Sequence, residues 1–493
     1  IASTHRTASA PLLDAWIAAG SAPLPTTTDS GALTAAEFVV GSEVFAGPDG
    51  LRYSDVGNAH RLIDRDGNRL RHVSHWSRWI MYSEGRWHLD AGDTLAAHSA
   101  SLVGVGLLDH LADVGADLHH RGALLRHARR SESAQGIAST LKVAKSLPEV
   151  AVDHERLDAD PWLLNVANGT VDLRTGMLRP HDPGDLITLQ SPTEFHEGAT
   201  APEFGAFLDQ ILPNPEVQSF VQRLAGLALR GDQPEQILPI SLGRGANGKS
   251  TLTRIIAAVL GGYSVVASRD LLLALKHDSH PTAKADLFRR RFAHSGELLS
   301  GARLDESQVK ELTGGDRIKA RRMREDHWEF DPSHLLWIHA NHRPNIEGTD
   351  DGIWRRVKLI PFDVQIPELE QDSMLAHRIL STESPGVLNW MLTGLAEYAA
   401  NGLRTPEAVR AATSEFRNES DIVAAFLADA GLVLAPSAWM PSADLLTLHE
   451  TWYEVAGIAE GQQANYRRVL GEFARRGVAQ GRRPVNGHRV RIW

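Results

Sequence analysis

The segment SLGRGANGKST, residues 241–251, constrains the fold of this chain more than any other feature. It matches the pattern G-x-x-x-x-G-K-[ST] at Gly243, Gly248, Lys249 and Ser250, between the apolar runs ILPISL and LTRIIAAVL. Glycines let backbone N–H groups converge on an anion, and a helix that follows points its positive N-terminus at the same place. We therefore expect a strand, a phosphate-binding loop and a helix, in that order.

Within this loop, Lys249 would reach the β- and γ-phosphates of a nucleoside triphosphate, and the Ser250 hydroxyl would bind Mg²⁺. The alternative is a glycine-rich turn that binds nothing. The strand-like run before the loop and the helix-like run after it favour the phosphate-binding interpretation. A phosphate loop alone does not separate kinases, GTPases, motors and helicases. The expected nucleotide-binding residues are Gly243, Arg244, Gly245, Ala246, Asn247, Gly248, Lys249, Ser250 and Thr251.

The composition indicates a globular chain. Its 493 residues predict about two to four domains, and we find no apolar run of about 18 residues that would span a membrane. The absence of cysteine excludes disulfides and cysteine-based metal sites. Together with the lack of a visible signal peptide, it fits a cytoplasmic protein. The net charge of −10 means that DNA contacts would come from local basic patches. The chain begins at Ile1 rather than Met, which leaves open an upstream priming domain.

The pattern along the chain divides it into five parts. Residues 1–31 read as a short helix and a linker, and residues 32–200 as a mixed α+β domain. Residues 201–365 alternate strand-like and helical segments, which favours an α/β fold with a parallel sheet. Residues 366–434 read as helices, and residues 435–493 form a basic segment after a Pro-rich break.

Three local signals predict turns or strand limits. A hairpin is expected at residues 78–89 with Glu84-Gly85 at its turn, and Asn168-Gly169 and Thr175-Gly176 flank a short strand. Pro239 cannot donate a hydrogen bond within a central strand, so the strand before the phosphate loop is expected to begin effectively at Ile240.

Downstream of the loop, RFAHSGELL ends a strand-like run at Glu297. A hydrolase needs a carboxylate beside Mg²⁺ to orient or polarise the attacking water, and Glu297 is the best placed candidate. Asp305 and Glu306 are weaker alternatives, since they suit the polar start of a helix better. The other interpretation of Glu297 is a solvated surface glutamate.

Two further segments carry groups suited to phosphate chemistry. HLLWIHANHRP is an apolar strand that ends in Asn341, where an open α/β sheet contacts its ligand, although a turn-forming Asn is the alternative. TDDGIWRRVKLIPF places Arg355 and Arg356 before another strand. An arginine there would serve as a finger, often from a neighbouring subunit, with a rate effect of roughly 10³–10⁵; a surface ion pair is the alternative.

A basic hairpin is expected between these segments. TGGDRIKARRMREDHWEF predicts a strand at 317–322, a tight turn around Arg324, and a strand at 327–330. Such a hairpin, projected into the pore of a ring, would grip the phosphates of a single DNA strand, whereas a solvated charge run is the alternative. Its candidate DNA-binding residues are Lys319, Arg321, Arg322 and Arg324.

The order of these features resembles that of superfamily 3 helicases, and more narrowly the C-terminal helicase part of phage and plasmid primase–helicases and their poxvirus-type relatives. The resemblance covers roughly residues 80–480 and is strongest over 237–362. LLNVANGTVDLRTGMLRPHDPGDLIT (163–188) and GVLNWMLTGLAEYAANGL (386–403) resemble the segments that flank the motor core in that family.

The resemblance implies an AAA+-type P-loop ATPase core that uses ATP and Mg²⁺ in a hexameric ring and moves 3′→5′ on single-stranded DNA. It makes Lys249 and Ser250 the nucleotide and Mg²⁺ ligands and Glu297 the Walker B acid. Asn341 would be the sensor and Arg355 or Arg356 the finger, with Arg355 preferred. Many relatives carry a second acid where this chain has Leu299, which weakens any shared role for two carboxylates.

The last 33 residues hold eight arginines against one acid, Glu472. A helix, NYRRVLGEFARRG, and a terminal strand, GHRVRIW, suggest the winged-helix module that the family often carries, which would hold duplex DNA. The leading hypothesis is therefore an ATP-dependent replicative helicase of a phage or mobile element, acting on single-stranded and forked DNA. An ATP-switched origin- or partner-binding protein and a motor for protein or packaged duplex are the alternatives, and no primase activity is expected of this chain.

Overall fold

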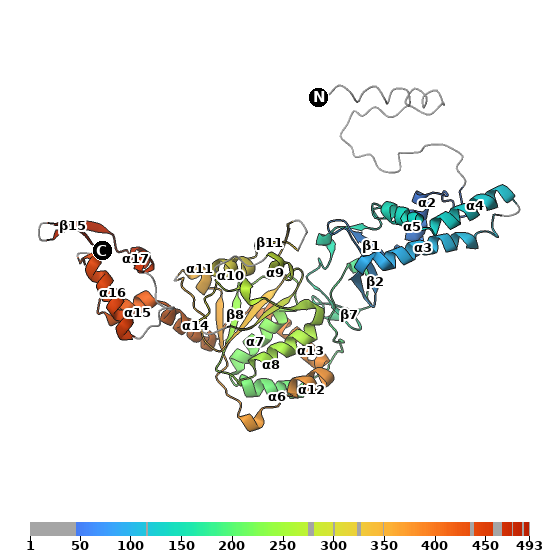
Figure 1. Ribbon diagram of the computed structural model, residues 1–493. Coiled ribbons are helices and arrows are strands. Elements are labelled where there is room, and N and C mark those ends of the chain that lie inside the picture. Colours follow the sequence, from blue (N-terminus) through green and yellow to red (C-terminus); the bar gives the residue numbers. More distant parts are fainter. Residues whose placement is uncertain are drawn as a thin grey trace, which may run out of the picture. The chain divides into compact units, whose positions relative to one another are not determined.

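The computed structural model describes residues 46–114, 117–274, 281–298, 301–322, 327–348, 350–433, 438–456, 466–475, 477–485 and 488–492. They form two compact units (Figure 1). Unit 1 comprises Leu89–Val152 and the described residues before Tyr82, and unit 2 comprises Tyr82–His88 and the described residues from Asp153 onward. The helix and linker predicted for 1–31, and Arg324 at the expected hairpin turn, lie outside the described residues.

Unit 1 is a small α/β assembly. Strand β1 (Leu70–Val73) pairs antiparallel with β2 (Arg78–Ser83) and parallel with β4 (Ala151–Val152). The apolar faces of its helices pack on these strands, and the buried core includes Leu62, Trp79 and Val103. The helices are α2 (Asp55–Asp66), α3 (Thr94–Asp109), α4 (Leu118–Ser131) and α5 (Ala134–Ala144), with a 3₁₀ turn η2 (Ala91–Asp93) before α3.

The hairpin expected at 78–89 is confirmed. Strand β2 ends at Ser83 and β3 (Arg86–Leu89) follows, so Glu84 and Gly85 form the turn. Both turn residues have positive φ, +50° and +78°, which is the geometry that suits the twist of a two-residue hairpin.

Among the residues that the structure describes, none of the helices combines the length and the apolar character that a membrane span requires.

Unit 2 is built on a five-stranded parallel sheet, as the alternation in the sequence predicts. The strand order is β14-β8-β13-β10-β9, and every neighbouring pair is parallel. Strand β8, which precedes the phosphate loop, lies between β13 and β14. Both of its neighbours in the sheet therefore come from much later in the chain. The strands are β8 (Leu238–Leu242), β9 (Ser264–Val266), β10 (Phe292–Leu298), β13 (Leu335–Ala340) and β14 (Val357–Pro361).

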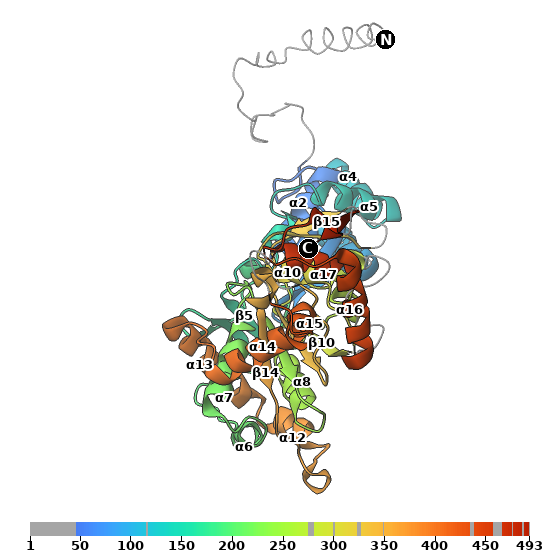
Figure 2. The ribbon, with the colours of Figure 1, turned by 90° about the vertical axis from the view of Figure 1, so that its left-hand side faces the viewer.

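Helices cover both faces of this sheet (Figures 1 and 2). Strand β13 shows the alternation: Leu335 and Trp337 join the core with α7, α8 and α13, whereas Leu336 and Ile338 join the opposite core. The first face carries α6 (Pro202–Ile211), α7 (Pro215–Leu227), α8 (Lys249–Leu260), α12 (Leu375–Thr382) and α13 (Ser384–Asn401). The second carries α9 (Pro281–Ala285), α10 (Glu306–Thr313), α11 (Asp351–Trp354), α14 (Glu407–Ser420) and the hairpin β11 (Ile318–Ala320)–β12 (Trp328–Phe330).

Strand β8 begins at Leu238, not at Ile240 as expected. Leu238 N donates to Arg356 O (2.7 Å), so the nitrogen of the next residue, Pro239, points away from β14 and toward β13. Pairing with β13 begins only at Ile240. The missing N–H of Pro239 therefore removes no ladder hydrogen bond, and the strand tolerates the proline.

The expected 32–200 domain is not one compact unit, because the boundary falls at Val152. A three-stranded sheet is formed by β5 (Leu163–Val166), β6 (Gly169–Asp172) and β7 (Met177–Arg179). Its first turn lies at 167–168, one residue before the expected position, and its second, at 173–176, includes the expected Thr175-Gly176. The sheet packs Leu164 and Val171 into the core of the large sheet. Tyr263 Oη also accepts a hydrogen bond from Asn165 N (3.0 Å). Residues 153–200 thus belong with the core of the large sheet rather than with unit 1.

The chain ends in a module with its own core. Its helices α15 (Ile422–Asp429), α16 (Ser442–Ala456) and α17 (Tyr466–Arg475) precede the hairpin of β15 (Gly481–Val485) and β16 (His488–Ile492). Phe426, Trp452 and Phe473 are buried together. The module therefore begins at α15, earlier than the expected residue 435, because Phe426 is part of its core. Its order of helices followed by a hairpin is the one expected of a winged helix.

Candidate nucleotide site

Gly243 and Gly248 are glycines because neither position has room for a side chain. A Cβ on Gly243 would lie 2.4 Å from the Phe362 carbonyl oxygen, and one on Gly248 would lie 2.5 Å from Ile211 Cγ2. Gly248 has a φ of +79° and Gly245 a φ of +99°, in the region that favours glycine. The loop between β8 and α8 therefore follows a tight path that larger residues would block.

Lys249 is buried at the centre of this loop. Its Nζ donates to Gly243 O (2.7 Å), to Asn247 Oδ1 (2.8 Å) and to Asn341 Oδ1 (3.2 Å), and the side chain is 4% exposed. These oxygens hold the ammonium group beside the loop that would wrap the phosphates. Lys249 and Asn341, two residues that the sequence selects for separate reasons, thus lie in contact.

The segment after β14 is fastened to the same loop. Asn247 Nδ2 donates to Phe362 O (3.3 Å), and Ile366 N donates to Ala246 O (2.7 Å). Phe362 N in turn donates to Leu242 O (2.8 Å). These bonds connect the loop to the segment directly after β14, which follows the loop by more than 100 residues. The spacing of residues in the sequence does not predict these contacts.

Asn341 and Glu297 end neighbouring strands. Asn341 follows directly after β13, and Glu297 lies at the carboxyl end of β10, next to Leu298, which pairs with Ala340. Parallel strands present their carboxyl ends at one edge of the sheet, where open α/β folds bind ligands. Both residues therefore lie at the edge that carries the phosphate loop.

Ser250 fits the role of a Mg²⁺ ligand that the sequence assigns to it. It lies in the first turn of α8, and its side chain is exposed beside the loop. Among the described residues, no cluster of three or more His, Asp or Glu side chains could hold a metal ion by itself. Mg²⁺ is commonly bound by few protein groups together with substrate phosphates, so a hydroxyl at this place suits an ion that arrives with a nucleotide.

A cleft of about 1100 Å³ opens at this edge of the sheet. One wall is the loop, with Gly243, Arg244 and Asn247, and another is the start of the loop after β13, with Asn341. Segment 361–365 and the α14 residues Ala408, Ala411 and Ala412 complete it. Its volume is slightly above the usual range of small-molecule sites, about 300–1,000 Å³, which is enough for a nucleotide.

Arg355 and Arg356 lie at the other end of the sheet. Arg356 O accepts from Leu238 N, at the amino end of β8, and the five residues of β8 span about 13 Å before the loop begins. Neither guanidinium is among the groups that line the cleft. The two candidate fingers are therefore not brought to the phosphate loop of their own chain.

The two arginines differ in exposure. Arg356 is buried, and its guanidinium donates to Thr313 Oγ1 (3.1 Å) and Gly352 O (2.6 Å); its burial lowers its pKa. Arg355 is exposed and donates to Gln236 Oε1 (2.9 Å). The internal hydrogen bonds of Arg356 give it a structural role, which leaves Arg355 as the candidate finger.

The basic hairpin is shorter than expected. Strands β11 and β12 pair over three residues each instead of the predicted 317–322 and 327–330, and Lys319 lies opposite Glu329. Ile318 and Ala320 are buried, whereas Lys319 and Arg322 are exposed and Arg321 is half-buried. Apolar and basic side chains therefore alternate along β11 and point to opposite faces, as the sequence predicts. Glu329, which lies opposite Lys319, reduces the positive charge of the exposed face.

His339 is a buried neutral group behind the loop. Burial, and the positive charges of His294 and Lys249, lower its pKa to about 4. His339 is therefore uncharged at neutral pH and places no second cation beside Lys249. The sequence does not single out His339, because an isolated histidine in an apolar strand carries no functional signal.

Sequence reasoning also missed Arg343. This residue and the α14 residues Glu415 and Glu419 line the cleft with the loop. The one signal for Arg343 in the sequence is its position two residues after Asn341, in HANHRP. Nothing in the sequence connects it to carboxylates more than 70 residues downstream.

Two family profiles match the chain in separate places. The first, described as "D5 N terminal like", matches residues 59–213. The second, described as a family of unknown function (DUF5906), matches residues 242–356 and so covers the phosphate loop, Asn341 and Arg355. Each profile matches less than half of the chain.

Curated relatives are viral proteins. A "Putative helicase" of Acanthamoeba polyphaga mimivirus is 28% identical over 314 residues, which are 58% of this chain and 32% of that protein. A second of the same name, from Invertebrate iridescent virus 6, is 27% identical over 242 residues, 46% of this chain and 24% of that protein. The "Putative primase" of African swine fever virus is 23% identical over 219 residues, 41% and 22% respectively. The chain spans a third or less of the length of these relatives.

Among solved structures, the C-terminal region of NrS-1 has the same fold. It superposes with a TM-score of 0.50 at 10% identity, over 88% of this chain and 97% of that chain.

Proposed function

We propose that this chain, which is similar to viral proteins named putative helicase and putative primase, is the ATP-hydrolysing motor of a replicative DNA helicase. The observation that carries the proposal is the contact of Lys249 Nζ with Asn341 Oδ1 inside a glycine loop at the carboxyl edge of a parallel sheet. A buried ammonium group there suits the β- and γ-phosphates of ATP. The fold alone would not carry the proposal, because many functions share it.

Hydrolysis would transfer the γ-phosphoryl group of ATP to water, giving ADP and inorganic phosphate. Lys249 neutralises charge on the phosphate oxygens, and Asn341 orients the γ-phosphate or the attacking water. Glu297, at the end of the next strand, accepts a proton from that water. Mg²⁺ held at Ser250 would add positive charge at the phosphates.

The proposed active unit is a ring of copies of this chain, a hexamer by family resemblance. Support comes from Arg355, which is exposed at the sheet end opposite the loop and cannot reach the nucleotide of its own chain. In a ring, the Arg355 edge of one protomer faces the cleft of the next, and the guanidinium completes the site across the junction.

DNA contacts would come from two basic elements. Lys319, Arg321 and Arg322 lie on or next to β11, where they would contact the phosphates of a strand in the ring pore, together with Arg324. Movement along that strand is proposed to be 3′→5′, again by resemblance. The C-terminal module adds exposed Arg482 and Arg483 on β15.

A second candidate function is ATP-switched binding to an origin or partner without processive unwinding. The observation in its favour is an aromatic–cation pair in the C-terminal module: Trp439 is 41% exposed, and the Arg483 guanidinium lies 5.8 Å from its ring centroid. Such a pair suits bases and phosphates. Strand displacement on forked DNA separates the two functions, because only the first predicts ATP-dependent release of the strand.

The proposal is tested at Lys249. The Lys249→Ala variant should lose ATP hydrolysis, measured as phosphate release, because no other ammonium group among the described residues donates into the loop. Lys145→Ala, an exposed lysine on unit 1, is the matched control and should hydrolyse ATP at the wild-type rate. Full activity in Lys249→Ala would refute the assignment of the site.

A further inference from the structure

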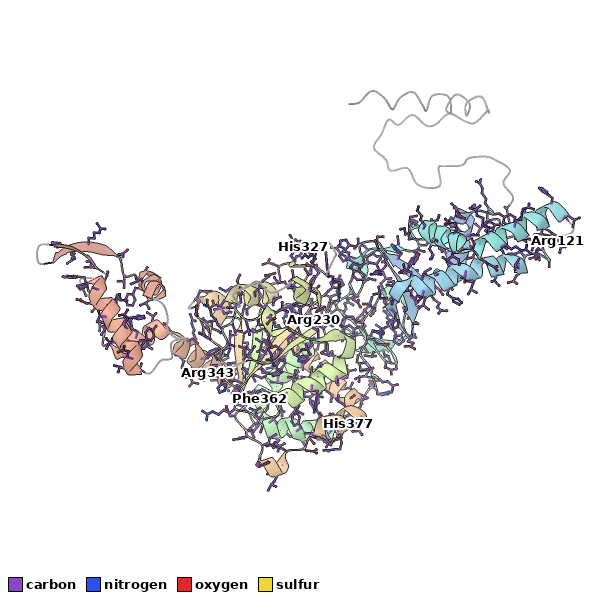
Figure 3. The ribbon with its side chains drawn as sticks, viewed as in Figure 1. Arg121, Arg230, His327, Arg343, Phe362 and His377 are labelled. Atoms are coloured by element: carbon purple, nitrogen blue, oxygen red, sulfur yellow. The ribbon has the colours of Figure 1, made fainter. Side chains whose placement is uncertain are left out.

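Arg343 lies in the cleft without a role in the mechanism above. It follows Asn341 by two residues, so its Cα lies within about 7 Å of that of Asn341. Its side chain lines the cleft together with Arg244 and Gly243 of the phosphate loop. Figure 3 labels Arg343 and Phe362, which both line this cleft. The guanidinium therefore lies in the cleft that borders the proposed phosphate-binding loop.

Two carboxylates of α14 bind this guanidinium. Arg343 Nη2 lies 3.1 Å from Glu415 Oε2, and Arg343 Nη1 forms an ion pair with Glu419 Oε2. The two glutamates are one helical turn apart, and both line the cleft. Their side chains are more than half exposed, whereas the Arg343 side chain is 27% exposed. The arginine is thus the more enclosed partner in a pairing that borders solvent.

Helix α14 also reaches the opposite end of the sheet. Leu359 N donates to Thr413 Oγ1 (3.0 Å), which fixes the helix on β14. One turn later, Arg417 Nη2 pairs with Asp351 Oδ1 (2.7 Å), in the short helix that directly precedes Arg355. One side of α14 therefore contacts the cleft through Arg343, and the other contacts the segment that holds the candidate finger.

We propose that Arg343 is a phosphate-binding residue of this cleft, and that Glu415 and Glu419 compete with the nucleotide for it. The inference rests on the proposed function, since it requires that the cleft binds ATP. A guanidinium binds carboxylate and phosphate through the same planar fork, so one ligand replaces the other without a change in the arginine. The triphosphate carries more charge than either carboxylate.

The exchange has a consequence for α14. When Arg343 turns to phosphate, two carboxylates lose their counter-ion beside an anionic ligand, and the repulsion pushes that part of the helix away from the cleft. Because Arg417 of the same helix pairs with Asp351, nucleotide binding in one protomer would shift the segment that presents Arg355 to the next. The helix is then the physical link between a cleft and the neighbouring site.

Affinity for the slowly hydrolysed analogue ATPγS, measured with Mg²⁺ by calorimetry on the full chain, tests the competition. The double variant Glu415→Gln/Glu419→Gln should bind about tenfold more tightly, because the competing carboxylates are gone. Arg343→Ala should bind about tenfold or more weakly, because a charge-assisted hydrogen bond is lost. Added to Arg343→Ala, the same two glutamine substitutions should raise the affinity less than they do in the wild type, because only the direct repulsion of the triphosphate by the carboxylates is then relieved.

The matched control is Arg410→Ala, which removes an exposed arginine of α14 that pairs with Glu407 outside the cleft. It should bind ATPγS as the wild type does. Wild-type affinity in the double glutamine variant, or an equally large gain from the same substitutions in the Arg343→Ala background, would overturn the inference. If Arg343→Ala does not fold, the double glutamine variant decides alone.

Failure of this inference is distinguishable from failure of the proposed function. If Lys249→Ala still binds ATPγS at wild-type affinity, the cleft is not the nucleotide site and both fail. If Lys249→Ala loses binding while Arg343→Ala binds as tightly as the wild type, only the role of Arg343 is refuted. A parallel titration with ADP shows whether Arg343 binds the γ-phosphate, which ADP lacks, or a phosphate that ADP retains.

Discussion

Lys249 Nζ lies 3.2 Å from Asn341 Oδ1, although 92 residues separate the two in the chain. Parallel pairing of β8 with β13 brings them together, because Leu242 at the end of one strand is aligned with Ala340 at the end of the other. Lys249 of the phosphate loop and Asn341 at the end of the neighbouring strand β13 therefore belong to one site.

Asn341→Ala should lower the kcat of ATP hydrolysis by about 10²-fold, because a positioned polar group at the reacting phosphate is lost. Binding of ATPγS should be close to wild type, since Lys249 keeps its other acceptors Gly243 O and Asn247 Oδ1. Phosphate release and calorimetry measure the two effects. Asn401→Ala, an exposed amide on α13, is the control. Unchanged kcat in Asn341→Ala would remove this residue from the reaction.

Arg356→Ala should destabilise the protein by about 2–4 kcal/mol, because the hydrogen bonds from its buried guanidinium to Thr313 Oγ1 and Gly352 O are lost. Arg355→Ala should leave the free energy of unfolding nearly unchanged, since that side chain is exposed. Chemical denaturation of both variants measures the difference. Equal losses in the two would contradict the structural role assigned to Arg356.

Glu329→Gln should strengthen binding to single-stranded DNA, because it removes the acid opposite Lys319 on the basic hairpin. Lys319→Ala/Arg322→Ala should weaken that binding and reduce the slope of log K against log salt by about 1.4, at about 0.7 per phosphate contact. Basal ATP hydrolysis should be unchanged in both. Fluorescence titrations with single-stranded DNA at several salt concentrations measure these affinities. An unchanged slope in the double variant would exclude the hairpin as the element that binds the DNA phosphates.

Stability should fall as the pH is lowered from about 6.5 to 4. Burial lowers the pKa of His334 and of His339 to about 4, below the ordinary value of 6.5. In this window the unfolded chain binds protons that the folded chain does not, so each histidine costs up to about 3 kcal/mol on acidification. The variant His334→Gln, which is neutral throughout, should show a shallower fall in denaturant titrations. A fall as steep as in the wild type would rule out His334 as a source.

The phosphate loop and the strand ends could be predicted because short-range rules determine them. Gly243 and Gly248 are required by contacts that allow no Cβ, and Asn341 follows an apolar strand whose carboxyl end must meet the ligand edge of the sheet. The boundary at Val152 could not be predicted in this way. It depends on where Leu164 and Val171 are buried, and apolar strand residues look the same in either domain.

The pairing of Arg343 with Glu415 and Glu419 illustrates a second gap. A charged helix face usually contacts solvent, and its pattern does not reveal that α14 lies on β14 with two carboxylates toward the cleft. Likewise, the sequence favoured Arg355 over Arg356 only by its place in the pair and gave no sign of which side chain is buried. Only packing against Thr313 and Gly352 separates them, because burial depends on segments far away in the chain.

The central claim is that a nucleotide in one protomer is completed by Arg355 of the next. Lys249→Ala and Arg355→Ala should each be inactive alone, because every junction lacks either the lysine or the finger. Mixed in equal amounts, they should recover about a quarter of wild-type ATP hydrolysis, since about one junction in four combines an intact loop with an intact Arg355. Activity of the mixture equal to the sum of the separate variants, at every ratio, would contradict a site shared between protomers.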